Sequence, residues 1–496
     1  MQTRLTTSSI FRDWQTLLLL LAFFGIRIVS FYLAPHAILQ AIIVFTMIFI
    51  LGLTFFKNPD YAWMIVLGEL LLGGAGHFFE FFGLSIRTIL ILVFLFLWIV
   101  YSLSNRDKTL FKIHIPHNLY YVLIPLAVFL FISATLGIFN GHKVHHVVQD
   151  LIPFSFFALL LPAFHLFREE KMQHYFVRLI IVFLIGSAVF SLFTFGLFTT
   201  ETVEINGEFY KWFRDVAMGK ITFVTDFFYR IVTPEHILIP PLMLIGYALL
   251  MRDEKHNKMW RFMFLCGALV LALNFSRAYL IGFVAGLIVL KYKHKMKRWL
   301  TVSLWSLIMI ILVFISVNIV SSMGSSLGLE IAGLRIGSMV LPETEISTNT
   351  RTALLTPIFA MVKQHPILGS GIGATLSYVN PYTYMQINTR HFDWGYLEMI
   401  VELGIVGSLI LLSIIGLLVY ELTKKIRSIS DFHDLYIGLL GGIAALLVIN
   451  ITAPALYHVL GIFYFAFVMA FVSKPVDLFD NVVTTLYRVF NKIKNE

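Results

Sequence analysis

Residues 38–56 read ILQAIIVFTMIFILGLTFF, an apolar run without a charged side chain. A run of this length crosses the hydrocarbon core of a bilayer as a helix. Only helices and closed barrels satisfy every backbone polar group in lipid, and this run lacks the apolar–polar alternation of a barrel strand. The stretch therefore predicts a transmembrane helix.

Similar runs recur along the whole chain, in which 58% of the 496 residues are hydrophobic and 13% are charged. This composition predicts an all-α fold, a polytopic transmembrane helical bundle with about fourteen spans. A large extracytoplasmic loop, residues 321–394, is expected to carry short helices. The expected spans are roughly 14–34, 37–56, 61–82, 84–103, 119–139, 150–167, 175–198, 232–251, 259–274, 278–290, 299–320, 395–420, 435–452 and 455–473.

The formal net charge of +9 resides largely in short loops between the apolar runs. The positive-inside rule places these loops, and both termini, in the cytoplasm. The connections at 140–149, 199–231 and 321–394, and a polar break at Arg277, then face outward. This distribution indicates the lipid bilayer as a partner and argues against nucleic acid.

The pattern divides the chain into four parts. Residues 1–258 hold N-terminal transmembrane helices, and residues 259–420 form a core that includes the outward loop 321–394. Residues 421–473 hold C-terminal transmembrane helices. Residues 474–496 place apolar side chains at helical spacing, which predicts an amphipathic cytoplasmic tail on the inner leaflet. Cys266 is the single cysteine, so no internal disulfide forms.

The longest polar stretch overlaps the large loop. Residues 350–407 read TRTALLTPIFAMVKQHPILGSGIGATLSYVNPYTYMQINTRHFDWGYLEMIVELGIVG. Charged and histidine side chains gather there around a glycine-rich turn. A membrane protein that concentrates polar groups in one loop holds something polar beside the bilayer. We therefore expect the loop to cover a substrate site.

Arg277 separates two short apolar runs in LALNFSRAYLIGF, residues 271–283. An arginine at this depth is costly unless it is paired or solvated, and by default it marks a site. Asn274 and Ser276 make the whole break polar. The alternative is an interfacial arginine whose head group reaches the water layer.

Arg351 opens a second candidate segment, with Pro357 expected to bend or interrupt it. The apolar residues of the segment fall at helical spacing and predict an amphipathic helix on the outer membrane surface. They are Ala353, Leu354, Ile358, Met361 and Val362. The alternative role for Arg351 is that of a solvated side chain at a helix start.

The segment ends in HPILGSGIG, residues 365–373. Gly369, Gly371 and Gly373 permit positive φ angles and a nest of backbone N–H groups that could bind an anion. A plain helix stop is the alternative explanation for the same residues.

His391 lies just before the next span and could act as a general base or orient an acceptor hydroxyl. Its alternative is an interfacial histidine in an aromatic belt. Glu398 and Glu402 follow one helical turn apart, where structural pairing with an arginine is expected. The loop 199–231 adds side chains that suit sugars and phosphates but also fit an ordinary interfacial segment: Tyr210, Lys211, Trp212, Phe213, Arg214, Lys220 and Arg230.

Ionisable residues elsewhere are given smaller roles. We expect the intramembrane Arg27, Glu69, His77 and Glu80 to pair among themselves or line a cavity. The three histidines of GHKVHH, residues 141–146, lack carboxylate or cysteine partners at ligand spacing. No metal site is predicted.

Two of these features resemble the O-antigen ligase and O-antigen polymerase superfamily of bacterial membrane glycosyltransferases. One is the break Ser276-Arg277-Ala278, and the other is the loop order R…HPILGSGIG…H…YLEMIVELGIVG. The resemblance covers roughly residues 260–410. It includes a histidine before a span that carries Glu402-Leu403-Gly404. The family commonly has Asn after that histidine, whereas Phe392 and then Asp393 follow here.

The resemblance implies an inverting glycosyltransferase of the bacterial inner membrane without metal or cofactor. Its donor would be a glycan on undecaprenyl pyrophosphate, and its acceptor a second glycan. The length of the chain favours a polymerase, with a ligase acting on lipid A core as one alternative and a flippase or other transporter of lipid-linked sugars as another. The resemblance implies catalytic roles for His391, Arg277 and Arg351, and substrate-binding roles for Arg390, Ser276, Gly369, Gly371 and Gly373.

Overall fold

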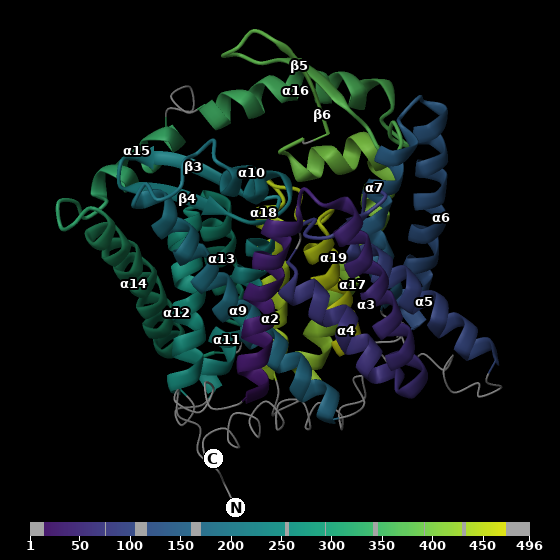
Figure 1. The fold of residues 1–496 in the computed structure, drawn as a ribbon, viewed down its shortest axis with the longest axis horizontal. Coiled ribbons are helices and arrows are strands. Elements are labelled where there is room, and N and C mark those ends of the chain that lie inside the picture. Colours follow the sequence, from purple (N-terminus) through teal and green to yellow (C-terminus); the bar gives the residue numbers. More distant parts are fainter. Residues whose placement is uncertain are drawn as a thin grey trace, which may run out of the picture.

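The apolar runs fold into a bundle of helices with further elements gathered at one end (Figure 1). The computed structural model describes residues 14–74, 76–104, 117–159, 170–252, 257–292, 294–340, 346–390, 392–428 and 433–472. The predicted amphipathic tail, residues 474–496, lies outside the described residues. The mostly helical fold is confirmed.

Eight helical segments within the described residues are long and apolar enough to cross a membrane. They lie in α2 (Trp14–Leu33), α3 (Ala37–Lys57), α5 (Ile86–Ser104), α6 (His117–Phe139), α9 (Glu170–Thr199), the pair η3 (Pro234–Leu238) and α11 (Ile239–Arg252), α14 (Met296–Ser321) and α17 (Gly395–Ser428). Four shorter apolar helices complete the set: α12 (Asn257–Asn274), α13 (Arg277–Val289), α18 (His433–Ile449) and α19 (Val459–Val472).

One predicted span differs from the structure, a second lies partly outside the described residues, and the count of fourteen is not confirmed. The segment 61–82 forms α4 (Pro59–Leu72), which ends at Gly73 and continues into the hairpin β1 (Glu80–Phe81) and β2 (Leu84–Ser85). The segment 150–167 begins within α7 (Val144–Ser155) and η2 (Phe156–Leu159). Glycines at 73, 74 and 76 end α4 early because Gly74 takes a positive φ of 65°.

The elements at one end of the bundle come from the two longest connections (Figure 1). We call this the loop end. The first connection supplies α10 (Glu208–Asp215) and the antiparallel hairpin β3 (Lys220–Thr225) and β4 (Phe228–Val232), in which Thr222 pairs with Arg230. The second supplies α15 (Leu329–Val340), α16 (Ile346–Gln364) and the hairpin β5 (Leu376–Val379) and β6 (Gln386–Thr389). These hairpins were not predicted from the sequence.

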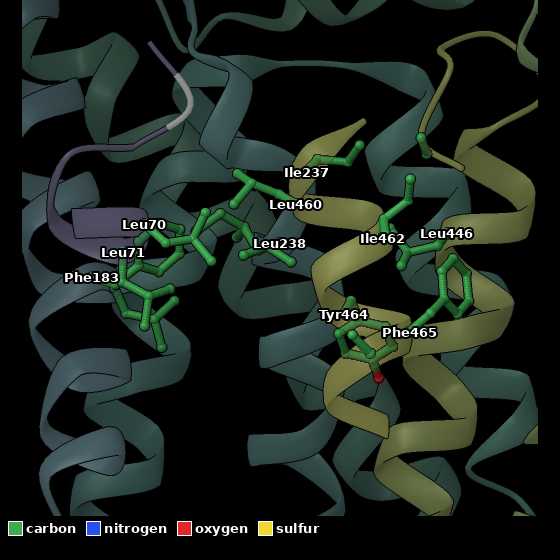
Figure 2. Packing of buried hydrophobic residues seen from close by; sticks show 14 of the residues in the cluster. Leu70, Leu71, Phe183, Ile237, Leu238, Leu446, Leu460, Ile462, Tyr464 and Phe465 are labelled. Carbon is green, nitrogen blue, oxygen red and sulfur yellow. The ribbon is translucent and has the colours of Figure 1, made fainter. Parts of the chain in front are cut away.

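The most buried part of the bundle surrounds α19 and η3. Figure 2 shows Leu460 of α19 beside Ile237 and Leu238, and Ile462 and Phe465 near Leu446 of α18. All of these side chains are less than 5% exposed. The fixed position of η3 matters because η3 and the β3–β4 hairpin join directly and carry site residues.

Charged side chains in the bundle pair across helices. Arg27 forms a buried ion pair of 3.2 Å with Glu235, so η3 is tied to α2. His77 pairs with Glu80 as predicted, whereas the partner of Arg27 is not one of the four residues expected. Glu69 lines a cavity of about 720 Å³ between α2, α3, α4 and α9, which is otherwise almost entirely apolar.

Candidate functional site

The HPILGSGIG turn is built into a break in α17. Gly404 has φ 64° and ψ −172°, so the helix cannot continue its own hydrogen-bond ladder there. The N–H groups of Ile405 and Val406 donate instead to the carbonyls of Pro366 and Ile367, at 3.0 and 3.1 Å. The turn therefore replaces the missing helical bonds and joins the loop rigidly to the span.

The same exchange holds on the other side of the break. The carbonyls of Val401 and Glu402, which a regular helix would bond to residues 405 and 406, accept from the N–H groups of Ser370 and Gly371 at 2.7 and 3.2 Å. The hydroxyl of Ser133 on α6 also donates to the Glu402 carbonyl, at 3.0 Å. The turn is thereby fixed against two spans.

The predicted positive φ angles are present at Gly369, Gly371 and Gly373, with values of 77°, 90° and 87°. At Gly371 a side chain is excluded twice over. Its φ is unfavourable for other residues, and a Cβ would lie 2.1 Å from the backbone nitrogen of Gly137. Close contact between the turn and α6 requires glycine here.

The nest of N–H groups binds an anion that belongs to the protein itself. The N–H groups of Gly373 and Ala374 donate to Oε1 of Glu402 at 3.0 and 3.1 Å. The structural role expected for Glu402 is present, but backbone amides take the place of the expected arginine. Since these donors are occupied, the turn positions the loop, and a substrate contact by the three glycines stays a proposal.

Helix α16 presents Arg351 over this framework. Pro357 does not interrupt the helix, which runs unbroken from Ile346 to Gln364. Leu354 and Ile358 are 2% and 0% exposed and pack in a small core with Leu376 and Phe392. The predicted apolar face of the segment is confirmed, and it holds α16 against the β5–β6 hairpin and the start of α17.

Arg351 belongs to a group of charges contributed by three segments. Its Nε lies 3.9 Å from Oδ2 of Asp393, and both side chains remain partly exposed. The ammonium group of Lys220 on β3 has its pKa lowered by partial burial, and then by the cations Arg230 and Arg351, while Asp393 opposes the shift. We call Lys220, Arg230 and Arg351 the cationic group. Asp393 lies among these cations.

The cationic group adjoins the break that carries Arg277. Arg230 donates from Nε to the carbonyl of Asn274 at 2.6 Å. Phe275 then takes a positive φ of 46° and stacks on Phe314, and Ser276 forms the N-cap of α13. Arg277 follows as the first residue of α13, half-buried, three residues beyond the carbonyl that binds Arg230.

Buried polar groups hold this break in place. Asn274 is 0% exposed and donates from Nδ2 to Nδ1 of His236 at 2.8 Å. Because the backbone N–H of Thr233 also donates to this Nδ1, at 3.4 Å, we assign the proton to Nε2, which faces the Ser191 hydroxyl at 3.1 Å. His236 follows Glu235, the partner of Arg27, so a chain of contacts ties the break to the membrane core.

Arg390 has partners that the sequence did not predict. Its guanidinium group forms an ion pair with Asp150 and donates to the side chain of Gln149, both on α7. A third contact of 3.5 Å reaches the carbonyl of His146. These bonds favour a structural role over the expected pyrophosphate contact, because the guanidinium is already engaged by α7. His391, the predicted base, lies outside the described residues.

Metal ligation has no obvious place in this arrangement. Across the described ranges, no group of three or more His, Cys, Asp or Glu side chains is arranged to hold a metal ion. The charge available for an anion comes from arginine and lysine side chains.

Comparison with protein families adds an independent finding at the same location. Residues 262–412 match the family model described as O-antigen ligase. This region is similar to the O-antigen ligase family. The ligase-like region contains Arg277, Arg351, the glycine turn and the break at Gly404, and its match supports the O-antigen ligase/polymerase superfamily that the sequence resembled. A comparison with curated proteins gave no match.

Family members are membrane enzymes of the glycosyltransferase or ligase type, and the family implies lipid-linked glycan substrates. Together with the apolar helices, the ligase-like region indicates a multi-pass protein of the bacterial inner membrane. Two cations of the site, Lys220 and Arg230, lie outside the ligase-like region. Their sequence surroundings also fit an ordinary interfacial segment, so the sequence alone does not mark them as site residues. Only the fold brings β3 and β4 beside Arg351.

Proposed function

We propose that the protein transfers a glycan from undecaprenyl pyrophosphate to an acceptor glycan at the outer face of the bacterial inner membrane. The observation that carries the proposal is the cationic group beside the break of Arg277. Lys220 interacts with Arg230 and Arg351, and Arg230 binds the turn that directly precedes Arg277. A diphosphate is the ligand that such a group suits best.

The reaction makes a specific demand on these cations. Transfer of the glycan breaks the bond between its anomeric carbon and the pyrophosphate oxygen, and negative charge then grows on the leaving group. Guanidinium groups stay charged at any relevant pH and bind phosphate oxygens in pairs. Preorganised donors of this kind contribute on the order of 10²–10³ in rate each. In this proposal the charge of Arg277, Arg351, Arg230 and Lys220 takes the place of a metal ion.

The lipid part of the donor needs an apolar surface next to this group. The cavity between α2, α3, α4 and α9 reaches Phe78 and Phe79 at the turn that follows α4. Phe78 stacks on Trp212 of α10, with ring centroids 5.8 Å apart, and Lys220 lies shortly after α10. A polyprenyl chain in this cavity would keep its pyrophosphate at the loop end.

Arg351 provides the decisive test. Replacing Arg351 with Ala removes one cation and one partner of Asp393, so we expect transfer by the purified protein to fall by about 10²-fold or more. Arg351→Lys keeps the charge but loses paired hydrogen bonds, and should retain part of the activity. Lys363→Ala is the matched control, because Lys363 is an exposed cation on the same helix.

The transfer activity of Arg351→Ala is interpreted only if the variant is present in the membrane at the normal level. Full transfer activity in this variant would remove the central assignment. Alanine variants of Arg277 and His391 should behave as Arg351→Ala does, whereas Lys363→Ala should transfer as the unchanged protein does.

The product of transfer separates the two enzymatic possibilities. We favour a polymerase that extends a lipid-linked repeat, and the ligase named in the family description is the second candidate. A deletion strain with single-repeat products indicates a lost polymerase. Accumulation of long lipid-linked polymer indicates a lost ligase.

A transporter of lipid-linked sugars would also need cations. Its charges should follow a path through the bilayer, whereas Lys220, Arg230 and Arg351 meet at the loop end. Incubation of purified protein with radiolabelled donor and acceptor decides between the classes, since a transporter forms no glycosidic bond.

A further inference from the structure

A second charged group also interacts with Asp393. Asp150 on α7 and Glu398 and Glu402 on α17 form what we call the acidic group. Glu398 interacts electrostatically with Glu402, Asp150 and Asp393. Arg390, paired with Asp150, also acts on both glutamates. Asp393 is therefore shared between an anionic and a cationic surrounding.

Several buried oxygen atoms of this group have no hydrogen-bond partner within the described part of the chain. Glu402 is 2% exposed, and while its Oε1 accepts from the glycine turn, its Oε2 has no partner. Oε2 of Glu398 and the hydroxyl of Tyr457 also have no hydrogen-bond partner there. Tyr457 interacts electrostatically with all three carboxylates of the acidic group. Buried polar atoms are almost always hydrogen-bonded, so the unpartnered oxygens of three interacting side chains indicate a polar ligand.

The chemistry of these atoms narrows the class of ligand. Two carboxylates repel a phosphate, and a hydrocarbon chain would leave all three oxygens unsatisfied. A neutral molecule with several hydroxyl groups can donate to both carboxylates and exchange a hydrogen bond with the Tyr457 phenol. Sugars have this property.

We propose that the acidic group binds the acceptor sugar and that Glu398 takes the proton of its attacking hydroxyl, which leaves to His391 the expected alternative of orienting that hydroxyl. This rests on the function proposed above. The hydroxyl oxygen forms a bond to the anomeric carbon of the donor as its proton moves to the Glu398 carboxylate. The bond from that carbon to the pyrophosphate oxygen breaks, and its electron pair leaves with the pyrophosphate. The proton later returns to water.

Two observations favour Glu398 over Glu402 as the proton acceptor. Glu402 is held by two backbone N–H groups of the turn, whereas the Glu398 side chain is more exposed. Glu398 also lies in the first turn of α17, at the loop end of that helix. Asp393 interacts with both the acidic and the cationic group, so the proposed acceptor and pyrophosphate sites are neighbours.

The test measures transfer and donor binding separately. In Glu398→Gln the side chain keeps its shape but cannot accept the proton, so turnover should fall by about 10²-fold or more. Binding of undecaprenyl pyrophosphate without a glycan, measured by titration of purified protein, should change less than about two-fold, because the cationic group is intact. Glu330→Gln, at an exposed carboxylate of the second long connection, is the control with unchanged turnover.

Turnover of Glu398→Gln within about three-fold of the unchanged protein overturns the proposal. So does a joint loss of turnover and undecaprenyl pyrophosphate binding, which indicates a structural role. If Glu398→Gln does not fold, Glu398→Asp decides, because its shorter carboxylate should retain partial turnover. Turnover equal to that of the unchanged protein, or no turnover at all, overturns the assignment. An unchanged protein that binds the lipid without transferring glycan refutes the proposed function itself, independently of Glu398.

Discussion

Lys220 and Arg390 show how the surroundings of a cation decide its role. Both lie at the loop end, but the guanidinium of Arg390 is engaged by Asp150 and Gln149, whereas Lys220 has two arginines and Asp393 around it. Partial burial, and then repulsion by the neighbouring arginines, lowers the pKa of Lys220 because both disfavour its protonated form. The negative charge of a bound phosphate would favour the protonated form of Lys220, which could then bind the phosphate.

The titration of Lys220 gives a prediction at this scale. A lowered pKa means that Lys220 loses its positive charge at a less alkaline pH than an ordinary lysine. Affinity for undecaprenyl pyrophosphate should therefore decline as pH rises from about 7 to about 10. Lys220→Arg keeps its charge over this range and should bind with nearly constant affinity. Equal declines in both proteins, in parallel titrations, would place the titrating group elsewhere.

Candidate site residues could be proposed from the sequence where the sequence itself is unusual. Arg277 and Arg351 stand out because arginine is costly beside apolar runs. The glycine spacing predicted positive φ angles, which the structure contains. The partners were not predictable. Asp150 meets Arg390, and Gly373 meets Glu402, only after distant segments pack together.

At the scale of elements, the exchange of hydrogen bonds between α17 and residues 366–371 fixes the loop end to the span. Both the span that forms α17 and the glycine turn were predicted from the sequence, but the turn was predicted as a possible anion-binding nest. The sequence could not show that a break at Gly404 would release two carbonyls and two N–H groups for the turn. The predicted span at 61–82 differs for a similar reason, since a hydrophobicity pattern does not show where the glycines after Leu72 end the helix.

The break yields a prediction about stability. A Cβ at Gly404 would lie 2.3 Å from the Ile367 carbonyl oxygen, in a backbone conformation that disfavours side chains. Gly404→Ala should therefore lower the free energy of unfolding by about 2 kcal/mol or more. Gly416→Ala, on the same helix with no atom within 4 Å of the added Cβ, should leave it unchanged or slightly raised. Thermal unfolding in detergent compares the two variants, and equal midpoints would contradict the assigned role of the break.

At the scale of the whole molecule, the two long connections meet at one end of the bundle (Figure 1). The helical character of the chain followed from its apolar runs alone. The side of the membrane that this end faces is a prediction from charge distribution, because nothing in the arrangement of helices distinguishes the two leaflets.

Labelling of introduced cysteines tests this orientation. The buried Cys266 is first changed to Ser so that it does not react. In that background a membrane-impermeant maleimide should label Tyr384→Cys in intact spheroplasts, since Tyr384 is 83% exposed at the loop end. Ser428→Cys, at the opposite end of α17, should react only after the membrane is opened. The reverse pattern would place the cationic group in the cytoplasm and remove the proposed donor site.

The rigid joint between the glycine turn and α17 also limits how this protein can move. Residues 366–371 share four backbone hydrogen bonds with α17, so the segment after α16 and the first turns of that span must travel as one body. The β3–β4 hairpin carries its two cations on a separate stretch of chain, attached at the break before α13. Admission of a bulky lipid-linked glycan, and release of the spent carrier, therefore have to leave this joint intact.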